Sequence, residues 1–192
     1  MKILVSVFNN LYTDQRVEKF CKTLHENAYQ IEVIGNNWGG NPEMQRPYPF
    51  SRISLQSKKL RFAYLEFQWK LFLALLKKAD QNTILHANDL DALLPNYLVS
   101  KIKGIPLVWD SHEIFTEMPT VTNRWVQHVW RLLENALIRK IKYFITANDS
   151  YANWFETNYK IKKPIVIRNF PQKSESPKSF DDNSPKIILY QG

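Results

Sequence analysis

Residues 2–35 read KILVSVFNNLYTDQRVEKFCKTLHENAYQIEVIG, and this segment holds two apolar runs on either side of an amphipathic stretch. The first run, residues 3–8, is rich in β-branched side chains and ends in two asparagines, which is typical of a strand buried on both faces. Apolar residues then recur at positions 17, 20, 21, 24 and 28, the spacing of one helix face. The second run, residues 31–34, is closed by Gly35. The segment therefore predicts a strand, a helix and a second strand.

Strands and helices continue to alternate as far as residue 167. After a loop rich in glycine and proline over residues 36–50, we expect strands over residues 52–55, 83–86, 105–109, 143–147 and 165–167, and helices over residues 60–78, 89–103, 124–140 and 151–159. Parallel strands joined by helices use right-handed crossovers, which cover both faces of one sheet. The predicted fold class is α/β, a Rossmann-like, doubly wound and mostly parallel sheet of about seven strands with helices on both faces.

The composition changes after residue 170. Residues 171–185 are polar and rich in proline, which is the composition of a linker. Residues 186–190 read KIILY, a new strand, and no helix follows to complete the unit. We expect a Rossmann-like N-terminal domain over residues 1–170, a linker over residues 171–185, and the first strand of a truncated second domain over residues 186–192.

Charge and cysteine content exclude several classes of protein. The 192 residues include 26 basic and 18 acidic ones, and the net charge of +8 asks for a partner or another physical reason. The single cysteine, Cys21, excludes a disulfide framework and a cysteine-cluster zinc site, and its position on the buried face of the first helix predicts a packed thiol. No apolar run reaches the roughly 18 residues of a spanning helix, and the N-terminus does not read as a signal peptide. We expect a cytoplasmic protein.

Much of the basic excess lies in one predicted helix. Residues 57–78 read SKKLRFAYLEFQWKLFLALLKK, with six basic residues and one acidic residue among aromatic side chains. Either this helix lies on an anionic membrane surface, at the inner face of the cytoplasmic membrane, or it covers the sheet and leaves a solvated basic edge. Residues 125–142 form a second basic and aromatic region. No nucleic-acid-binding motif is present, so we expect no nucleic acid partner.

Polar side chains follow five of the predicted strands. In an open parallel sheet, ligands bind beyond the carboxyl ends of the strands. Helix capping alone explains a polar residue at any one of these ends, but five polar ends on one edge favour a ligand cleft. The polar segments are residues 9–14, 86–89, 110–113, 148–150 and 168–169.

Several enzyme classes lack their motifs here. The turn after the first strand has no G-x-G-x-x-G, which argues against a nicotinamide dehydrogenase, and the chain has no Walker A sequence and no G-x-S-x-G elbow. Asp89-Leu90-Asp91 has the D-x-D spacing with which some sugar transferases hold a metal. Here it opens a helix, where acidic residues favour the dipole, and we expect no metal. His112 is either a structural loop histidine or a ligand contact.

Five motifs occur in an order that resembles one family. They are Asn10-Leu-Tyr-Thr-Asp-Gln-Arg-Val17, His86-Ala-Asn-Asp-Leu-Asp91, Asp110-Ser-His-Glu113, Val166-Ile-Arg-Asn169 and Ile187-Ile-Leu-Tyr-Gln-Gly192. Together they resemble the N-terminal half of a bacterial glycosyltransferase of family 4 with the GT-B fold. The resemblance implies two Rossmann-like domains that face a cleft, the N-terminal one holding the acceptor and the C-terminal one most of the nucleotide-sugar.

The resemblance also implies roles for particular residues. His112 matches a catalytic histidine that reaches the donor sugar near the reacting carbon. Asn10, Thr13, Asp14 and Arg16 match a loop near the diphosphate and acceptor, although this loop lacks the glycines of many relatives. The other candidate substrate-binding residues are the polar strand ends His86, Asn88, Asp89, Glu113, Asn148 and Asn169. Family members use no metal and retain the sugar configuration, so the nucleotide-sugar is expected as a co-substrate and no cofactor is expected.

The predicted function is transfer of a hexosyl-type sugar from a nucleotide-sugar donor to a glycan or lipid-linked acceptor, in cell-envelope polysaccharide synthesis. The groups that neutralise the diphosphate in the family lie beyond residue 192, so we expect these 192 residues alone to be inactive. One alternative is another GT-B-fold enzyme, such as a nucleotide-sugar epimerase. A second alternative is a non-catalytic Rossmann-like module for binding or membrane docking.

Overall fold

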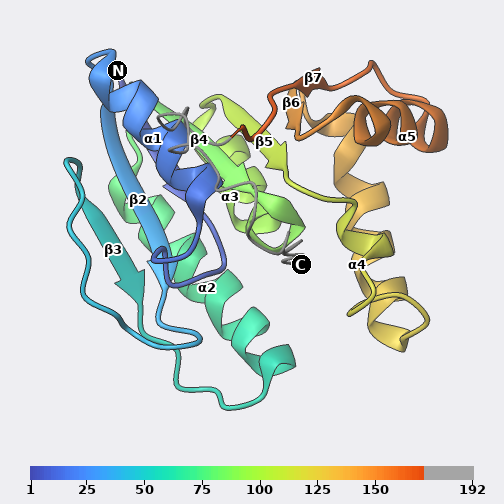
Figure 1. The fold of residues 1–192 in the computed structure, drawn as a ribbon, viewed down its shortest axis with the longest axis horizontal. Helices are drawn as coiled ribbons and strands as arrows, with labels where there is room; N and C mark the ends of the chain where they lie inside the picture. Colours follow the sequence, from blue (N-terminus) through green and yellow to red (C-terminus); the bar gives the residue numbers. More distant parts are fainter. Residues whose placement is uncertain (171–192) are drawn as a thin grey trace, which may run out of the picture.

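The computed structural model describes residues 1–170, which form one seven-stranded sheet flanked by helices (Figure 1). The strands are β1 (Lys2–Ser6), β2 (Gln30–Asn36), β3 (Phe50–Ile53), β4 (Thr83–Asn88), β5 (Leu107–Ser111), β6 (Tyr143–Thr146) and β7 (Ile165–Val166). The helices are α1 (Gln15–Glu26), α2 (Leu60–Lys78), α3 (Asp89–Lys103), α4 (Trp125–Leu137) and α5 (Asp149–Tyr159), with 3₁₀ turns η1 (Phe115–Glu117) and η2 (Ile138–Lys140). The expected linker and the strand over residues 186–192 lie outside the described residues.

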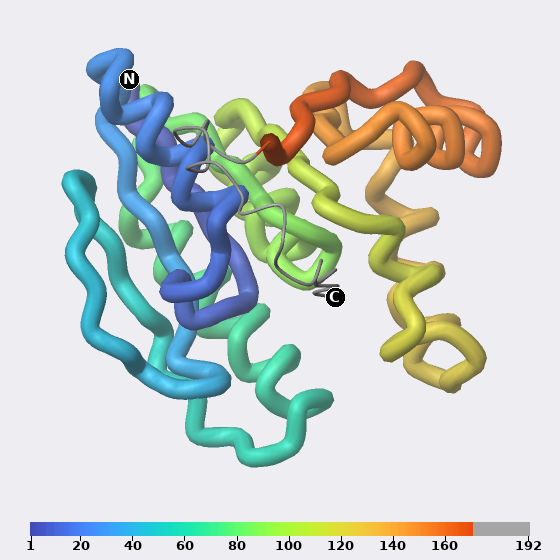
Figure 2. The backbone as a smooth tube through the Cα atoms, in the orientation of Figure 1, coloured from blue at the N-terminus to red at the C-terminus, as the bar shows by residue number. Residues whose placement is uncertain are grey.

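All neighbouring strands of the sheet are parallel, in the order β3-β2-β1-β4-β5-β6-β7. The strands that follow β4 extend the sheet to one side of β1, while β2 and β3 extend it to the other (Figure 2). The chain therefore reverses direction across the sheet between β1 and β4, which is where open α/β sheets bind their ligands. The predicted α/β, Rossmann-like, doubly wound fold is confirmed.

Side chains alternate along β1 between two separate cores. Ile3, Val5 and Val7 pack with the buried face of α1, including Cys21. Leu4, between them, belongs to the larger core beneath the helices that follow β3. Figure 1 shows the corresponding layers, with α1 on the opposite side of the sheet from α2 and α3. Because both faces of the central strands are covered, these strands read as continuous apolar runs in the sequence.

The thiol of Cys21 is fully buried in the core under α1, as its place on the helix face predicts. Burial raises the pKa of Cys21 to about 12, with the carboxylate of Asp14 acting in the same direction. A thiol with this pKa is not a nucleophile at neutral pH. It therefore fills space in the core.

Pro95 lies inside α3 without ending the helix. A proline has no N–H, so the carbonyl four residues earlier, that of Asp91, loses its helical partner. The side-chain amide of Gln68 on α2 donates to this carbonyl at 2.8 Å. A side chain of a neighbouring helix thus supplies the hydrogen bond that the proline removes.

The helix predicted over residues 124–140 is shorter than expected, because it becomes a 3₁₀ turn after Leu137.

Glu134 on α4 is a carboxyl group buried in the larger core region. It accepts hydrogen bonds from the hydroxyls of Tyr159 on α5 and Thr116 on η1, while its Oε1 atom has no partner among the described residues. Burial raises the pKa of Glu134 to about 7, and the hydrogen bonds from Tyr159 and Thr116 act in the opposite direction. The folded protein therefore keeps a proton on Glu134 over a pH range in which the unfolded chain releases it.

We predict that Glu134 lowers the stability of the protein as the pH rises. Between its ordinary pKa of 4.5 and its folded pKa of about 7, the unfolded state binds fewer protons than the folded state, so the free energy of unfolding falls by up to about 3 kcal/mol. Glu134→Gln should remove this contribution. Urea unfolding of both proteins at about pH 5 and about pH 8 measures it as the difference between the two pH dependences.

The exposed Glu156 on α5 offers a matched control, because Glu156→Gln makes the same chemical change at the surface. It should leave the pH dependence of stability unchanged. Equal pH dependence in Glu134→Gln and the wild type would show that Glu134 is ionised in the folded protein at neutral pH.

Candidate functional site

The turn between β1 and α1 is shaped by its own side chains. Asn9 accepts a hydrogen bond from the N–H of Leu11 at 2.7 Å, and Asn10 accepts one from the N–H of Tyr12 at 3.0 Å. Leu11 has a φ of +67°, which side-chain-bearing residues adopt only when neighbouring contacts hold them there. Asp14 caps α1 by accepting from the N–H of Val17 at 2.9 Å. The turn thus reaches the helix without a glycine.

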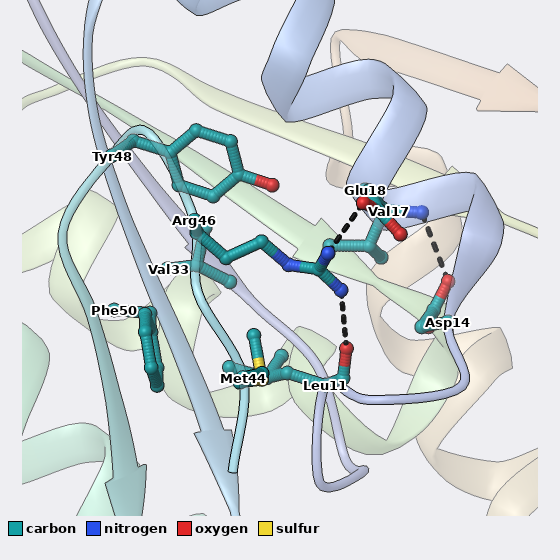
Figure 3. Close-up of a pocket in the computed structure, with 9 residues that line it drawn as sticks. All are labelled: Leu11, Asp14, Val17, Glu18, Val33, Met44, Arg46, Tyr48 and Phe50. Atoms are coloured by element: carbon teal, nitrogen blue, oxygen red, sulfur yellow. Dashed lines mark hydrogen bonds and ion pairs between the residues drawn. The ribbon is translucent and has the colours of Figure 1, made fainter.

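Groups from the β2–β3 region hold the backbone carbonyls of this turn. The N–H of Asn36 donates to the carbonyl of Asn9 at 2.8 Å, and Nε of Arg52 donates to that of Asn10 at 2.7 Å. Arg46 donates to the carbonyl of Leu11 at 3.1 Å (Figure 3). Three successive carbonyls are therefore fixed from one side.

Arg46 and Gly35 complete this contact between the two regions. The guanidinium of Arg46 also pairs with Glu18 on α1, so that it links the turn, the helix and the loop before β3 (Figure 3). A Cβ at Gly35 would lie 2.5 Å from Cγ of Leu11 and 2.6 Å from the carbonyl oxygen of Asn9. Only glycine allows this approach, which explains why β2 has a glycine at this position.

Arg16 and Asp110 form a buried ion pair between α1 and β5. Nη2 of Arg16 lies 2.6 Å from Oδ1 of Asp110, and Nε lies 3.2 Å from Oδ2, so the contact is bidentate. Nη1 of Arg16 donates to the carbonyl of Ile167, just after β7, at 2.7 Å. The exposed fractions of the two side chains are 9% and 1%. This arginine therefore joins α1, β5 and the chain after β7.

His112 follows β5, and both of its ring nitrogens face protein oxygens. Nδ1 lies 3.3 Å from Oδ2 of Asp89, whose other oxygen accepts the backbone N–H of His112 at 2.8 Å. Nε2 lies 3.1 Å from Oδ1 of Asn88 and 3.8 Å from Oδ2 of Asp110. Asn88 uses its amide N–H on the carbonyl of Ser6 at 3.1 Å, and this contact turns its oxygen toward the histidine. The ring of His112 is therefore held in one orientation at the carboxyl edge of the sheet.

Asp89 reaches His112 from a strained position. Its φ is +58° at the first residue of α3, a left-handed conformation that aspartate tolerates better than most residues. Burial raises the pKa of Asp89, and its contacts with His112 lower it in part. Asp91, two residues later, is buried, and burial raises its pKa well above the ordinary value. Within residues 1–170, no three histidine, cysteine, aspartate or glutamate side chains come together as a metal-binding group.

His86 lies on β4 beneath α1. Its ring stacks on Phe20 with the ring centroids 4.4 Å apart and the planes 8° apart. Burial lowers the pKa of His86 to about 4, with Asp110 acting in the opposite direction. The imidazole is therefore neutral at physiological pH and forms part of the support under the site.

These contacts assemble one polar centre from three separate parts of the sequence: α1, the junction of β4 and α3, and the end of β5. The sequence of residues 14–170 matches the model of Glycosyltransferase Family 4. The chain belongs to this family. The resemblance inferred from the five motifs is thereby confirmed, and so is the Rossmann-like unit of a GT-B fold. Among curated protein sequences, none matches the chain.

Solved structures with the same fold include a sucrose-phosphate synthase, a galactosyltransferase and an epimerase. Sucrose-phosphate synthase from Thermosynechococcus elongatus is 10% identical with a TM-score of 0.68, and the match covers 88% of this chain and 48% of that one. The lipopolysaccharide outer core galactosyltransferase WaaB is 12% identical with a TM-score of 0.58, covering 96% and 50%. UDP-GlcNAc 2-epimerase from Methanocaldococcus jannaschii is 12% identical with a TM-score of 0.51, covering 88% and 45%. The family 4 chain thus spans about half the length of each of these proteins.

The structure brings some of the predicted site residues of this family 4 chain together and leaves others apart. Arg16, Asn88, Asp89 and His112 are connected through one another and through Asp110, and Nδ1 of His86 lies 3.5 Å from the side-chain amide of Asn88. The remaining predicted residues are Asn10 and Asp14, which shape the first turn and cap α1; Thr13 and Glu113, which are exposed; Asn148, which caps α5; and Asn169, which accepts from Lys19.

Sequence reasoning missed three residues of the site. Asp110 was expected beyond the end of its strand, whereas β5 continues through Ser111 and buries it. The sequence signal that could have indicated its burial is its two-residue spacing from Val108, which places both side chains on the same face of β5. Arg46 and Arg52 lie in and after a long loop, and nothing in their local sequence indicates which carbonyls they contact.

We predict that removing one partner of the Arg16–Asp110 pair strongly destabilises the family 4 domain. Arg16→Met leaves the carboxylate of Asp110 buried without its partner, and should lower the free energy of unfolding by about 3–5 kcal/mol. The double variant Arg16→Met, Asp110→Leu should recover most of the loss, because no unpaired charge remains. Urea unfolding measures all three proteins.

The exposed pair Lys22–Glu26 on α1 is a matched control. Nζ of Lys22 lies 3.9 Å from Oε1 of Glu26, and the two side chains are 50% and 61% exposed. Lys22→Met should therefore change stability by less than about 1 kcal/mol. A similarly small effect of Arg16→Met would contradict a structural role for the buried pair.

Proposed function

We propose that this chain is the acceptor-side domain of a glycosyltransferase that moves a sugar from a nucleotide-sugar donor to a glycan or lipid-linked acceptor. The observation that supports it best is the fixed position of His112 at the carboxyl end of β5, in a chain of family 4. In this proposal residues 1–170 form the N-terminal domain. The same proposal includes four further points. The transferred sugar is of the hexosyl type, its configuration is retained, and the reaction uses no metal. The reaction belongs to cell-envelope polysaccharide synthesis.

The chemistry of sugar transfer assigns a task to such a site. When the bond between sugar and phosphate breaks, positive charge develops on the sugar and negative charge on the leaving diphosphate. Fixed donors that face the charged region stabilise the transition state without reorganising during the reaction. The acceptor hydroxyl must also be held in line with the reacting carbon, which is a matter of positioning.

His112 fits the first task because its orientation is set before the substrate arrives. Asp89 holds Nδ1, and Asn88 holds Nε2, so the ring cannot turn freely. Its side chain is 16% exposed, which leaves part of the ring accessible from the carboxyl edge. We propose that a hydroxyl of the donor sugar takes the place of Asn88 as the partner of Nε2. Asp89 is then a positioning residue for the ring.

A second candidate function is isomerisation of the nucleotide-sugar itself. The likeness to UDP-GlcNAc 2-epimerase supports it, since that enzyme shares the fold. Incubation of the complete gene product with nucleotide-sugars, with and without glycan acceptors, distinguishes the two reactions. A transferase releases the nucleoside diphosphate in an acceptor-dependent way. Conversion of the nucleotide-sugar to its epimer without an acceptor would instead establish the second function.

We predict that His112→Ala in the complete gene product lowers kcat on the order of 10²-fold, as removal of one transition-state donor does. The exposed His128 on α4 is the control, and His128→Ala should keep the wild-type kcat. Steady-state kinetics with a nucleotide-sugar and acceptor measure kcat, and thermal unfolding measures Tm. His112→Ala with near-normal kcat and a lowered Tm would make His112 a structural residue.

A further inference from the structure

Helix α2 carries large apolar side chains on two opposite faces. Its inner face, with Phe67, Leu71 and Leu75, is fully buried against the sheet and α3. This face accounts for the contact that holds the helix on the domain. A helix that only covers a sheet presents polar residues on its other side.

The outer face of α2 forms an apolar ridge instead. The ridge consists of Phe62, Leu65, Trp69 and Leu73, whose exposed fractions are 49%, 68%, 62% and 45%. Their spacings of three, four and four residues place them in one line along the helix, over about 17 Å at 1.5 Å per residue. Single exposed apolar residues are ordinary, but a contiguous line of them indicates a surface that binds something apolar.

Positive charge surrounds the ridge at both ends. Lys58, Lys59 and Arg61 lie where α2 begins, and none of them takes part in an ion pair among the described residues. Cations at a helix N-terminus oppose the helix dipole, so folding alone does not favour them there. Lys77 and Lys78 lie in the last turn, and Lys78 pairs with Glu32.

Glu66, the acidic residue of α2, does not neutralise the basic residues at the ends of the ridge. Glu66 accepts hydrogen bonds from the N–H groups of Gln56 and Ser57, and it pairs with Lys70 at 2.6 Å. These contacts lower the pKa of Glu66 to about 2. Its carboxylate is thus engaged by the segment before the helix.

We propose that α2 docks the protein on an anionic lipid surface, with the ridge in the boundary between headgroups and acyl chains and the flanking cations on lipid phosphates. Apolar side chains in a line with basic residues around them are the features of a helix that lies in a membrane interface. A second copy of the same chain would bring like charges together around the ridge, whereas anionic headgroups neutralise them. No helix within residues 1–170 is long and apolar enough to cross a membrane.

This docking goes beyond the proposed function and does not depend on it. The basic end of the ridge follows β3 in the sequence, and His112 follows β5, so both come after the carboxyl ends of parallel strands of one sheet. An acceptor held in a bilayer would therefore meet the protein on the side of the candidate site. Failure of sugar transfer leaves the lipid contact intact, and the two proposals are tested separately.

Co-sedimentation of the 192-residue chain with vesicles tests the docking. We expect binding to phosphatidylcholine vesicles that contain phosphatidylglycerol, and weaker binding to vesicles of phosphatidylcholine alone. Binding to the anionic vesicles should fall when the ionic strength rises from about 0.05 M to about 0.5 M, because the Debye length shortens. The variant Leu65→Gln, Trp69→Gln should bind at least about tenfold less, since two large side chains no longer enter the interface.

Two further variants test whether binding depends on the basic residues and on the position of the ridge. Lys58→Gln, Lys59→Gln should lower binding to the anionic vesicles by about fivefold for each charge removed. Lys163→Gln, Ile165→Gln changes a basic residue and a 64% exposed apolar residue at the β7 edge, and should bind like the wild type. Circular dichroism shows that each variant retains its fold.

Three results would overturn the proposal. One is absence of binding to anionic vesicles at low salt. Another is an equal loss of binding in the β7-edge variant and in Leu65→Gln, Trp69→Gln. The third is a dimer in sedimentation analysis that dissociates in Leu65→Gln, Trp69→Gln, because the ridge would then be an interface between two copies.

Discussion

The ion pair between Arg16 and Asp110 sets the geometry on which the carboxyl edge of the sheet depends. One guanidinium in the first turn of α1 contacts a carboxylate on β5 and the carbonyl of Ile167 after β7. Residues almost a full domain apart in the sequence are thereby held at fixed distances. Because both charges are nearly excluded from water, neither can be lost without a large cost, and the pair tolerates little movement of α1 across the sheet.

The polar residues around this pair form a connected series of hydrogen bonds and polar contacts. Asp110 lies near Nε2 of His112, His112 contacts Asn88, and Asn88 contacts the backbone of β1. Each member limits the orientation of the next, as buried polar networks do when their hydrogen bonds are made. Elements from both halves of the sheet are thus combined at the point where the strand order reverses. The position of the His112 side chain therefore depends on contacts with residues of the sheet and of α3.

The sequence alone was sufficient for the architecture of this domain, because apolar runs and helical spacing are local properties. Helix capping was one explanation that the sequence offered for the polar strand ends, and Asp14 and Asn148 do cap α1 and α5. Contacts between distant segments were not accessible in this way. Arg16 illustrates the limit, because nothing in its motif indicates that its guanidinium pairs with Asp110 and donates to the carbonyl of Ile167. Only the folded sheet shows which loops meet, and local patterning carries no record of these partners.

The hydrogen bond from Gln68 to the carbonyl of Asp91 has a consequence for protein engineering. Gln68 of α2 supplies the hydrogen bond that the Asp91 carbonyl of α3 lacks because of Pro95. The sequences of the two helices therefore have to be kept together. A chimera that takes α3 from this chain and α2 from a relative without a glutamine at the matching position would leave a buried carbonyl without a donor. Recombination between family members should therefore place its crossovers before β3 or after β5 and not between these two helices.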